Sequence, residues 1–155
     1  MNQNLEASLR RPRVTVAALV CRDNRFLFVE ERDVQGNQVI NQPAGHLECG
    51  ESVLEGVVRE TLEETAWHVK PLAVVGLYLW APPDSSISYL RVAVEAEALR
   101  FEPDRPLDEG IEQAVWMTLD ELKVRQAQHR SPLVLRCVED FLAKERFPLS
   151  LLKSL

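Results

Sequence analysis

The chain has 155 residues, of which 46% are hydrophobic and 27% are charged. This length fits one globular domain with one active site, because independent cores form within roughly 100 to 200 residues, and the composition excludes a disordered chain. The formal net charge of -6 argues against a nucleic-acid polymer as a partner, since binding to a phosphate backbone requires a basic surface. A small anionic substrate would need a bound cation.

The ends of the chain and its cysteines indicate where the protein works. Residues 1–12 form a polar leader without an apolar segment, residues 149–155 form a short tail, and the longest apolar run, 14–21, is far shorter than a membrane span. We therefore expect a single domain over 1–155, a cytoplasmic location and no membrane partner. The cysteines, at positions 21, 49 and 137, are odd in number and show no paired metal-ligand spacing, which favours a reducing compartment.

The first predicted element is a β-hairpin. Residues 14–21 and 25–32 are rich in β-branched and aromatic residues, and only Arg22, Asp23 and Asn24 separate them. Two such runs joined by a short polar turn are typical of paired antiparallel strands. A sheet therefore opens the fold.

A loop at 41–51 and an amphipathic helix follow the hairpin. Ser52 and Glu55 have the spacing of a capping box, in which each side chain bonds the backbone N–H of the other residue, so the helix is predicted to start at Ser52. The expected apolar side of this helix consists of Val53, Leu54, Val57, Val58 and Leu62.

The second half of the chain is predicted to contain three strands and then two helices. The strands are expected at 71–80, 87–99 and 112–119, and the first helix at about 119–126. The last helix is predicted to begin with Ser131 as its N-cap and Pro132 at its first position. The order of the elements indicates a mixed α/β fold.

Three glutamates crowd the C-terminal half of the helix after Ser52. Helical positions advance by about 100° each, so Glu60, Glu63 and Glu64 fall within roughly a 100° arc, away from the apolar side. Carboxylates about 5 Å apart repel each other by roughly 3 kcal/mol per pair at an effective dielectric constant near 20, and Arg59 alone does not balance three of them. A solvated surface is one interpretation of such a face. The other is a Mg²⁺ site, in which the ion polarises a phosphoryl oxygen of a small phosphorylated substrate.

The segment that carries these glutamates resembles the signature of the Nudix hydrolases. That signature is a glycine, five residues, a glutamate, seven residues, Arg-Glu, an apolar residue, any residue, Glu-Glu, any residue, a glycine and an apolar residue. The positions of this chain that have the same spacing are Gly45, Glu51, Arg59, Glu60, Glu63, Glu64 and Trp67. Two positions depart from it: Thr61 takes an apolar place, and Ala66 replaces a glycine that in the family adopts a left-handed conformation, which costs alanine about 1 kcal/mol.

The resemblance implies a Nudix-type α/β/α sandwich with a mixed sheet and a catalytic loop-helix. It also implies that Glu60, Glu63 and Glu64 supply carboxylate ligands to Mg²⁺, or to Mn²⁺ in its place, and that the carbonyl of Ala44 adds another oxygen. Arg59 and Glu51 would orient these ligands, because the planar guanidinium of arginine can hold a carboxylate at two points.

Family members often take one further acid from outside the signature. The segment LDEGIEQAVW, residues 107–116, offers Asp108, Glu109 and Glu112. We expect Glu112 to be the additional metal ligand. The alternative is that these acids only make a loop soluble.

Short stretches outside the signature are similar to the NudJ-type phosphatase branch of the family: NQPAGHLE, YLWAPPD, YLR, RSPLV and RFPL. The similarity implies Mg²⁺-dependent release of phosphate from hydroxymethylpyrimidine diphosphate or from a nucleotide. Asn41, Gln42 and His46 would line the entrance to the substrate site, and Trp80 would offer a flat face to a ring. Core packing of Trp80 and solvation of His46 are the structural alternatives.

Two other functions stay open at this point. An ADP-ribose pyrophosphatase is one, because family members of that type can show a proline about fifteen residues beyond the signature, where Pro82 stands. A nucleotide-binding sensor module without catalysis is the other, although the intact set of acids argues against it. The protein is expected to be a monomer or a homodimer, with the apolar tail FPLSLLKSL packed on its own domain.

Overall fold

The computed structural model describes residues 11–155, so the predicted polar leader lies outside the described residues except for its last two. Seven strands form one sheet: β1 (Arg13–Arg22), β2 (Arg25–Arg32), β3 (Gln38–Asn41), β4 (Ala44–His46), β5 (Trp67–Trp80), β6 (Tyr89–Phe101) and β7 (Ile111–Met117). The strands follow the order β3-β2-β1-β6-β5, with β4 added to β1 and β7 added to β2. The β1–β6 pair is parallel and the other pairs are antiparallel, so the predicted mixed sheet is confirmed.

The sheet opens between β1 and β2, and this opening positions the site. The two strands pair only next to their connecting turn, at Cys21–Phe26 and Arg22–Arg25. Beyond that point β1 pairs with β4, while β2 pairs with β3 and β7. The chain crosses from one half of the sheet to the other through Gln42 and Pro43, which join β3 to β4.

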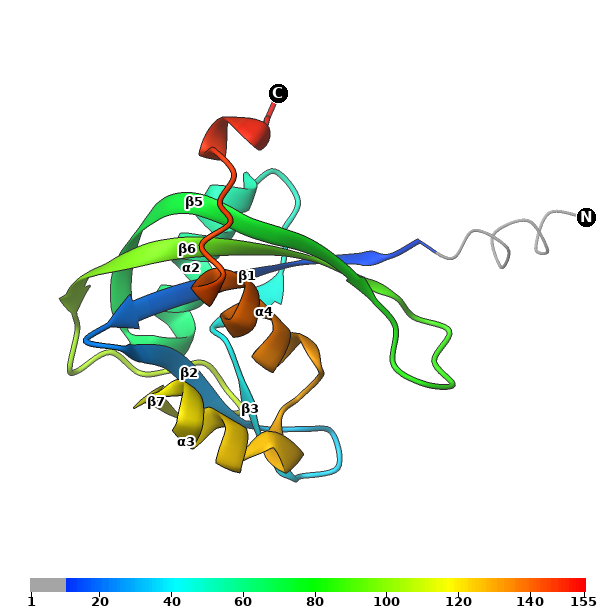
Figure 1. The fold of residues 1–155 in the computed structure, drawn as a ribbon, viewed down its shortest axis with the longest axis vertical. Helices are drawn as coiled ribbons and strands as arrows, with labels where there is room; N and C mark the ends of the chain where they lie inside the picture. Colours follow the sequence, from blue (N-terminus) through cyan, green and yellow to red (C-terminus); the bar gives the residue numbers. More distant parts are fainter. Residues whose placement is uncertain (1–10) are drawn as a thin grey trace, which may run out of the picture.

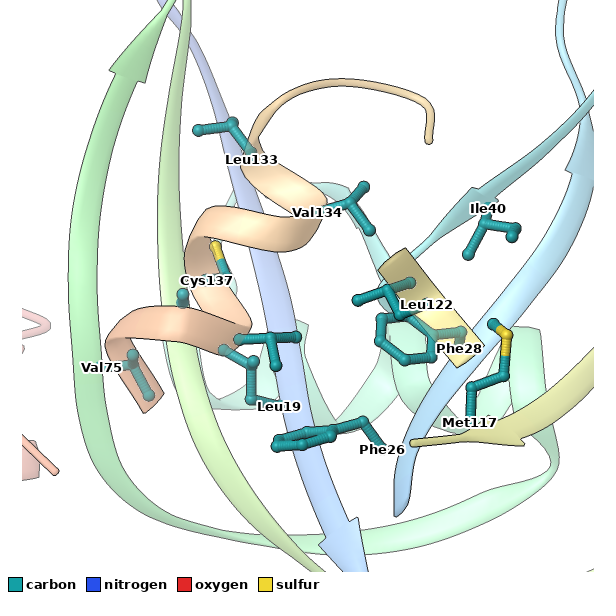
Figure 2. Packing of buried hydrophobic residues seen from close by; sticks show 12 residues of the cluster. Leu19, Phe26, Phe28, Ile40, Val75, Met117, Leu122, Leu133, Val134 and Cys137 are labelled. Atoms are coloured by element: carbon teal, nitrogen blue, oxygen red, sulfur yellow. The ribbon is translucent and has the colours of Figure 1, made fainter. Parts of the chain in front are cut away.

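Helices cover both faces of the sheet (Figure 1). Helix α2 (Val53–Thr65) packs one face, where Val57 contacts a buried cluster that includes Val16 and Val92. Helices α3 (Leu119–Val124) and α4 (Leu133–Leu142) cover the other face, together with the short 3-10 helix η1 (Gln126–Gln128). In Figure 2, Leu133, Val134 and Cys137 of α4 lie close to the cluster that contains Leu19 and Phe26. The predicted α/β/α sandwich is therefore confirmed.

The helix starts follow the local capping chemistry. The Ser52 hydroxyl accepts a hydrogen bond from the Glu55 N–H at 3.2 Å, and a Glu55 carboxylate oxygen accepts one from the Ser52 N–H at 2.7 Å, as predicted. Before α4, the Ser131 hydroxyl accepts a bond from the Leu133 N–H at 3.2 Å, and Pro132 already has helical angles. The regular helix is assigned only from Leu133, a difference of one residue from the predicted start.

Two strand predictions need correction. The segment 41–51 was expected to be a loop, but Ala44–His46 forms β4, which the pairing with β1 stabilises despite the weak strand propensity of its sequence, Ala-Gly-His. Strand β5 begins at Trp67, four residues before the predicted start at 71. The strand accommodates Pro71 because β5 is an edge strand and its register shifts at that point.

The C-terminal tail packs on its own domain, as expected. The backbone of Phe147 exchanges two hydrogen bonds with Val74 of β5, at 2.8 and 2.9 Å. Leu149, in the 3-10 helix η2 (Leu149–Leu151), and Leu152 pack against the cluster beneath α2.

No helix within residues 11–155 is long and apolar enough to cross a bilayer. The three cysteines are free thiols, and Cys49 is exposed.

Candidate active site

The carboxylates of Glu60 and Glu64 lie on the buried side of α2. The two residues are only 8% and 7% exposed, and they share this side with Val57 and Thr61. The prediction that the acidic face points away from the core was therefore wrong for these two glutamates; Glu63, at the edge of the same face, stays half-buried. Thr61 fits this buried side because its hydroxyl donates a hydrogen bond to the Val57 carbonyl at 2.7 Å.

Strand β4 passes directly over these carboxylates. A Cβ atom at Gly45 would overlap the carboxylate of Glu60, so no larger residue fits there without displacing that side chain. The N–H of the neighbouring Ala44 donates a hydrogen bond to a Glu64 carboxylate oxygen at 2.9 Å. The close contact between β4 and α2 thus fixes the positions of both buried glutamates.

Arg59 connects the acidic side chains. Its Nε and Nη2 atoms bond both oxygens of Glu51, at 2.9 and 2.6 Å. Its Nη1 atom donates to Glu60 at 2.8 Å and to Glu63 at 3.1 Å, and Nη2 also reaches the His46 carbonyl at 3.1 Å. One guanidinium therefore holds three carboxylates, and its hydrogen bonds lower the pKa of Glu51.

The buried carboxylates remain short of positive charge. Burial raises the pKa of Glu60, and it raises the pKa of Glu64 to about 9. The negative charges of Glu31 and Asp108 act in the same direction on Glu64. A carboxylate in these surroundings is stabilised in its charged form only when a further cation approaches.

The oxygen donors are those that a hard divalent cation takes, although they do not yet surround a common point. Within residues 11–155 no three acidic, histidine or cysteine side chains converge at metal-ligand geometry. Glu60 and Glu63 instead face Arg59, and Glu64 faces the Ala44 amide. The donor chemistry and the excess of buried negative charge fit Mg²⁺ or Mn²⁺.

A cavity of about 310 Å³ is lined by Ala44 and Gly45 of β4, the strand that contacts Glu60 and Glu64, but none of the acidic side chains of α2 lines it. Its walls include Ala44 together with three of the residues expected to contact substrate, Asn41, His46 and Trp80. The Trp80 ring stacks on Tyr89 with ring centroids 6.4 Å apart, which gives the cavity an aromatic wall.

Gln42, the fourth residue predicted to contact substrate, does not line the cavity. It is only 1% exposed, and its amide nitrogen donates to the Val134 carbonyl of α4 at 2.7 Å. Its amide oxygen accepts a hydrogen bond from Arg91 at 3.0 Å, so both polar groups of the Gln42 side chain are bound within the protein.

Glu112 lies apart from the acidic group of α2. It forms an ion pair with Arg32 and accepts a hydrogen bond from Gln38 at 2.6 Å. Asp108 is closer to the group: its N–H donates to the Glu63 carbonyl at 3.0 Å, and its charge raises the pKa of Glu60.

Three charged residues that line the cavity, Glu31, Arg91 and Arg130, were not among the predicted site residues. Glu31 and Arg130 form an ion pair at 2.9 Å. A signal was available for Arg91, because an arginine in the middle of the apolar run YLRVAV interrupts a strand that is otherwise buried.

Comparisons with known proteins show the family to which the chain is similar. The family model of the NUDIX domain matches residues 11–137. Phosphatase NudJ of Escherichia coli (strain K12) is 34% identical over 142 residues, which cover 92% of this chain and 91% of that protein. A NUDIX hydrolase structure from Nitrosomonas europaea superposes with a TM-score of 0.92 and is 43% identical, covering 94% of this chain and 98% of the other.

A more distant structure shows the fold alone. The bifunctional NMN adenylyltransferase/ADP ribose pyrophosphatase of Francisella tularensis, complexed with AMP and a Mn ion, is 22% identical with a TM-score of 0.63. The match covers 90% of this chain and 43% of that protein.

Proposed function

Because this chain belongs to the Nudix hydrolase family, enzymes that act on phosphoric anhydrides, we propose that it releases orthophosphate from a small organic diphosphate or a nucleotide. The observation that carries the proposal is the pair of buried carboxylates, Glu60 and Glu64, which contact Ala44 and Gly45 of β4 in the wall of a cavity that also has an aromatic side. The relative that is 34% identical over 92% of the chain is named a phosphatase, which supports phosphate release as the reaction.

A divalent cation, Mg²⁺ or Mn²⁺, is part of this proposal. Glu60, Glu63 and Glu64 would hold it, with the Ala44 carbonyl as an additional oxygen donor. Asp108 takes the place of Glu112 as the candidate acid from outside α2, because Glu112 is bound to Arg32 and Gln38. When bound, the ion would neutralise the carboxylates and polarise a phosphoryl oxygen. Glu60 and Glu63 would have to turn from Arg59 toward the ion, and Arg59 would stay in place through its two bonds to Glu51.

The remaining residues of the site have separate tasks in the proposal. A carboxylate of the α2 group orients the attacking water and accepts its proton. The cavity wall formed by Trp80 and Tyr89 packs against the organic group of the substrate, while Asn41 and His46 lie at its polar side. Gln42 acts through Arg91, to which its amide oxygen is bonded at 3.0 Å.

Product analysis tests the proposal. The purified protein is incubated with Mg²⁺ or Mn²⁺ and a panel of hydroxymethylpyrimidine diphosphate, nucleoside diphosphates, nucleoside triphosphates and ADP-ribose. The proposal predicts that orthophosphate appears from at least one diphosphate or nucleotide and that EDTA stops its release. If the ligands bind without any cleavage, the protein is a sensor module and the proposal is wrong.

An ADP-ribose pyrophosphatase is the second candidate, on one observation. Pro82 lines the cavity beside Trp80 and also lines an adjoining cavity of about 550 Å³, so the site has room for a ligand larger than a diphosphate ester. The same panel separates the two candidates, because this activity yields AMP and ribose phosphate from ADP-ribose and no orthophosphate.

A further inference from the structure

Arg91 is a buried arginine in the wall of the cavity. It lies in β6, is only 7% exposed and lines the cavity next to Asn41. Thr15 of β1 lies between Arg91 and His46 in the sheet, because it pairs with Arg91 of β6 on one edge of β1 and with His46 of β4 on the other edge. Side chains of directly paired residues point to the same face of a sheet, and all three of these residues line the cavity.

The partners of the Arg91 guanidinium are neutral. Nη1 donates to the Gln42 amide oxygen at 3.0 Å, and Nη2 donates to the Asn41 amide oxygen at 3.1 Å. The buried Nε–H has no hydrogen-bond partner. In the part of the chain from 11 to 155, no carboxylate forms an ion pair with Arg91.

Two other arginines, the exposed Arg130 and the partly buried Arg125, have a carboxylate partner. Arg130 lines the same cavity and pairs with Glu31 at 2.9 Å, and Arg125 pairs with Glu30. A buried charge is costly unless an opposite charge compensates it, and amide oxygens satisfy hydrogen bonds without cancelling the charge. The positive charge of Arg91 is therefore available to a ligand, whereas that of Arg130 is already paired.

A structural role explains the hydrogen bonds of Arg91 but not its charge. Gln42 links the guanidinium to the Val134 carbonyl of α4, so the network holds β6, the end of β3 and α4 together. A neutral donor could make the same links at a lower desolvation cost. An anionic ligand bound in the cavity would explain why the residue is charged.

We propose that Arg91 binds an anionic phosphoryl oxygen of the substrate and so selects phosphorylated ligands for this cavity. The inference rests on the proposed function, because it names how the same site holds its substrate. Asn41 and Gln42 fix the orientation of the guanidinium through its two ends. Arginine suits this task because the donors of its planar guanidinium match phosphate geometry.

Binding without metal isolates this interaction from hydrolysis. Inorganic pyrophosphate is titrated into the full-length protein by calorimetry, in EDTA and at fixed ionic strength. Arg91→Gln removes the charge but keeps a polar side chain, and it should weaken the affinity at least about tenfold, as expected for a lost charge-assisted hydrogen bond. Arg25→Gln is the matched control: it removes one positive charge at a residue that lines neither cavity and pairs with Glu121, and it should leave the affinity unchanged.

Arg91→Lys keeps the charge and loses the two-ended geometry. It should bind pyrophosphate more weakly than the unchanged protein and, with metal and a cleavable substrate, raise KM more than it lowers kcat. It also decides the outcome if Arg91→Gln fails to fold. The inference is wrong if a folded Arg91→Gln binds pyrophosphate as tightly as the unchanged protein, or if the unchanged protein does not bind pyrophosphate detectably. If the glutamine variant does not fold, unchanged affinity in Arg91→Lys is the result that overturns the inference. None of these results depends on cleavage, so they leave the proposed reaction standing.

Discussion

Two groups of buried charge lie near one cavity, and they are unbalanced in opposite directions. On α2, a single guanidinium, that of Arg59, holds Glu51, Glu60 and Glu63, while Glu64 has only the Ala44 N–H. In β6, Arg91 has amide partners and no carboxylate among residues 11–155. The first group lacks a cation and the second lacks an anion.

The comparison of these two groups with the rest of the molecule indicates that charges near the cavity are left without a partner so that they can bind a ligand. Elsewhere in the molecule, charges are paired within the chain, as in Arg125 with Glu30 or Arg146 with Glu95. Near the cavity, the pairing is left incomplete at a cost in stability. A divalent cation together with a phosphorylated substrate would complete both groups at once.

The largest expected effect is on catalysis by the acidic group. Glu64→Gln keeps an oxygen that can accept the Ala44 N–H but removes the charge, so it should lower the rate of phosphate release at least about a hundredfold, the loss of a few kcal/mol of transition-state stabilisation. The melting temperature of the metal-free protein should not fall. Undiminished turnover would remove Glu64 from the ligand set.

Gly45→Ala tests the contact between β4 and α2. The added methyl group would overlap the Glu60 carboxylate, and relieving the overlap should cost about 1–3 kcal/mol of stability and lower activity more than tenfold. Gly36→Ala is the control: its left-handed backbone also disfavours alanine, but nothing lies within 4 Å of the added atom. Thermal melts and rates of both variants should show a stability loss in each but an activity loss only at Gly45.

Arg59→Lys tests whether the ligands need a fixed guanidinium. Lysine cannot hold Glu51 at two points, so Glu60 and Glu63 should lose their orientation, and activity should fall about tenfold to a hundredfold, the range for residues that orient metal ligands. Arg25→Lys changes an exposed arginine that pairs with Glu121 and lines neither cavity, and its rate should match that of the unchanged protein. Equal rates in both variants would show that Arg59 only stabilises the helix.

Burial of Glu64 should change how the stability of the protein depends on pH. The folded pKa of Glu64, about 9, is above its unfolded value, so the unfolded state releases the proton first as pH rises. In EDTA, its contribution to stability is complete below the unfolded pKa and is lost as pH rises toward about 9. Melting curves should therefore show a smaller decline over this range in Glu64→Gln than in the unchanged protein, and equal declines would contradict the burial of this charge.

The smallest expected effect lies at the end of α2, away from both charged groups. Ala66 has φ 60° and ψ 17°, the left-handed conformation that the resemblance to the family implied, and its N–H donates to the Leu62 carbonyl at 2.9 Å. Ala66→Gly should relieve this strain and raise the melting temperature by about 2–4 °C with little change in turnover. Ala98→Gly in β6, where no left-handed conformation is present, should lower it instead.

Features that depend on neighbouring residues were readable from the sequence. The hairpin of β1 and β2, the capping box at Ser52 and the start of α4 near Ser131 all follow from residue types at fixed spacing, and the left-handed Ala66 follows from the resemblance to the family. The mixed sheet with helices on both faces followed from the resemblance to the family.

Features that depend on contacts between distant segments were not readable. The burial of Glu60 follows from Gly45 leaving space above it, and helix periodicity with a rule that charges are exposed gives the opposite answer. Strand β4 forms through pairing with β1, which outweighs the low strand propensity of Ala-Gly-His. Glu112 follows a turn at Gly110, where φ is +89°, and forms an ion pair with Arg32. Asp108 and Glu112 are only four residues apart in the sequence, so their positions in the chain did not indicate which of the two lies near α2.

Titration of Mn²⁺ or Mg²⁺ into the metal-free protein by calorimetry tests the central claim, that the glutamates of α2 are arranged to hold a divalent cation. The account predicts measurable binding by the unchanged protein, weakened at least about tenfold in Glu64→Gln. Absence of binding by the unchanged protein, both alone and with pyrophosphate present, would contradict it.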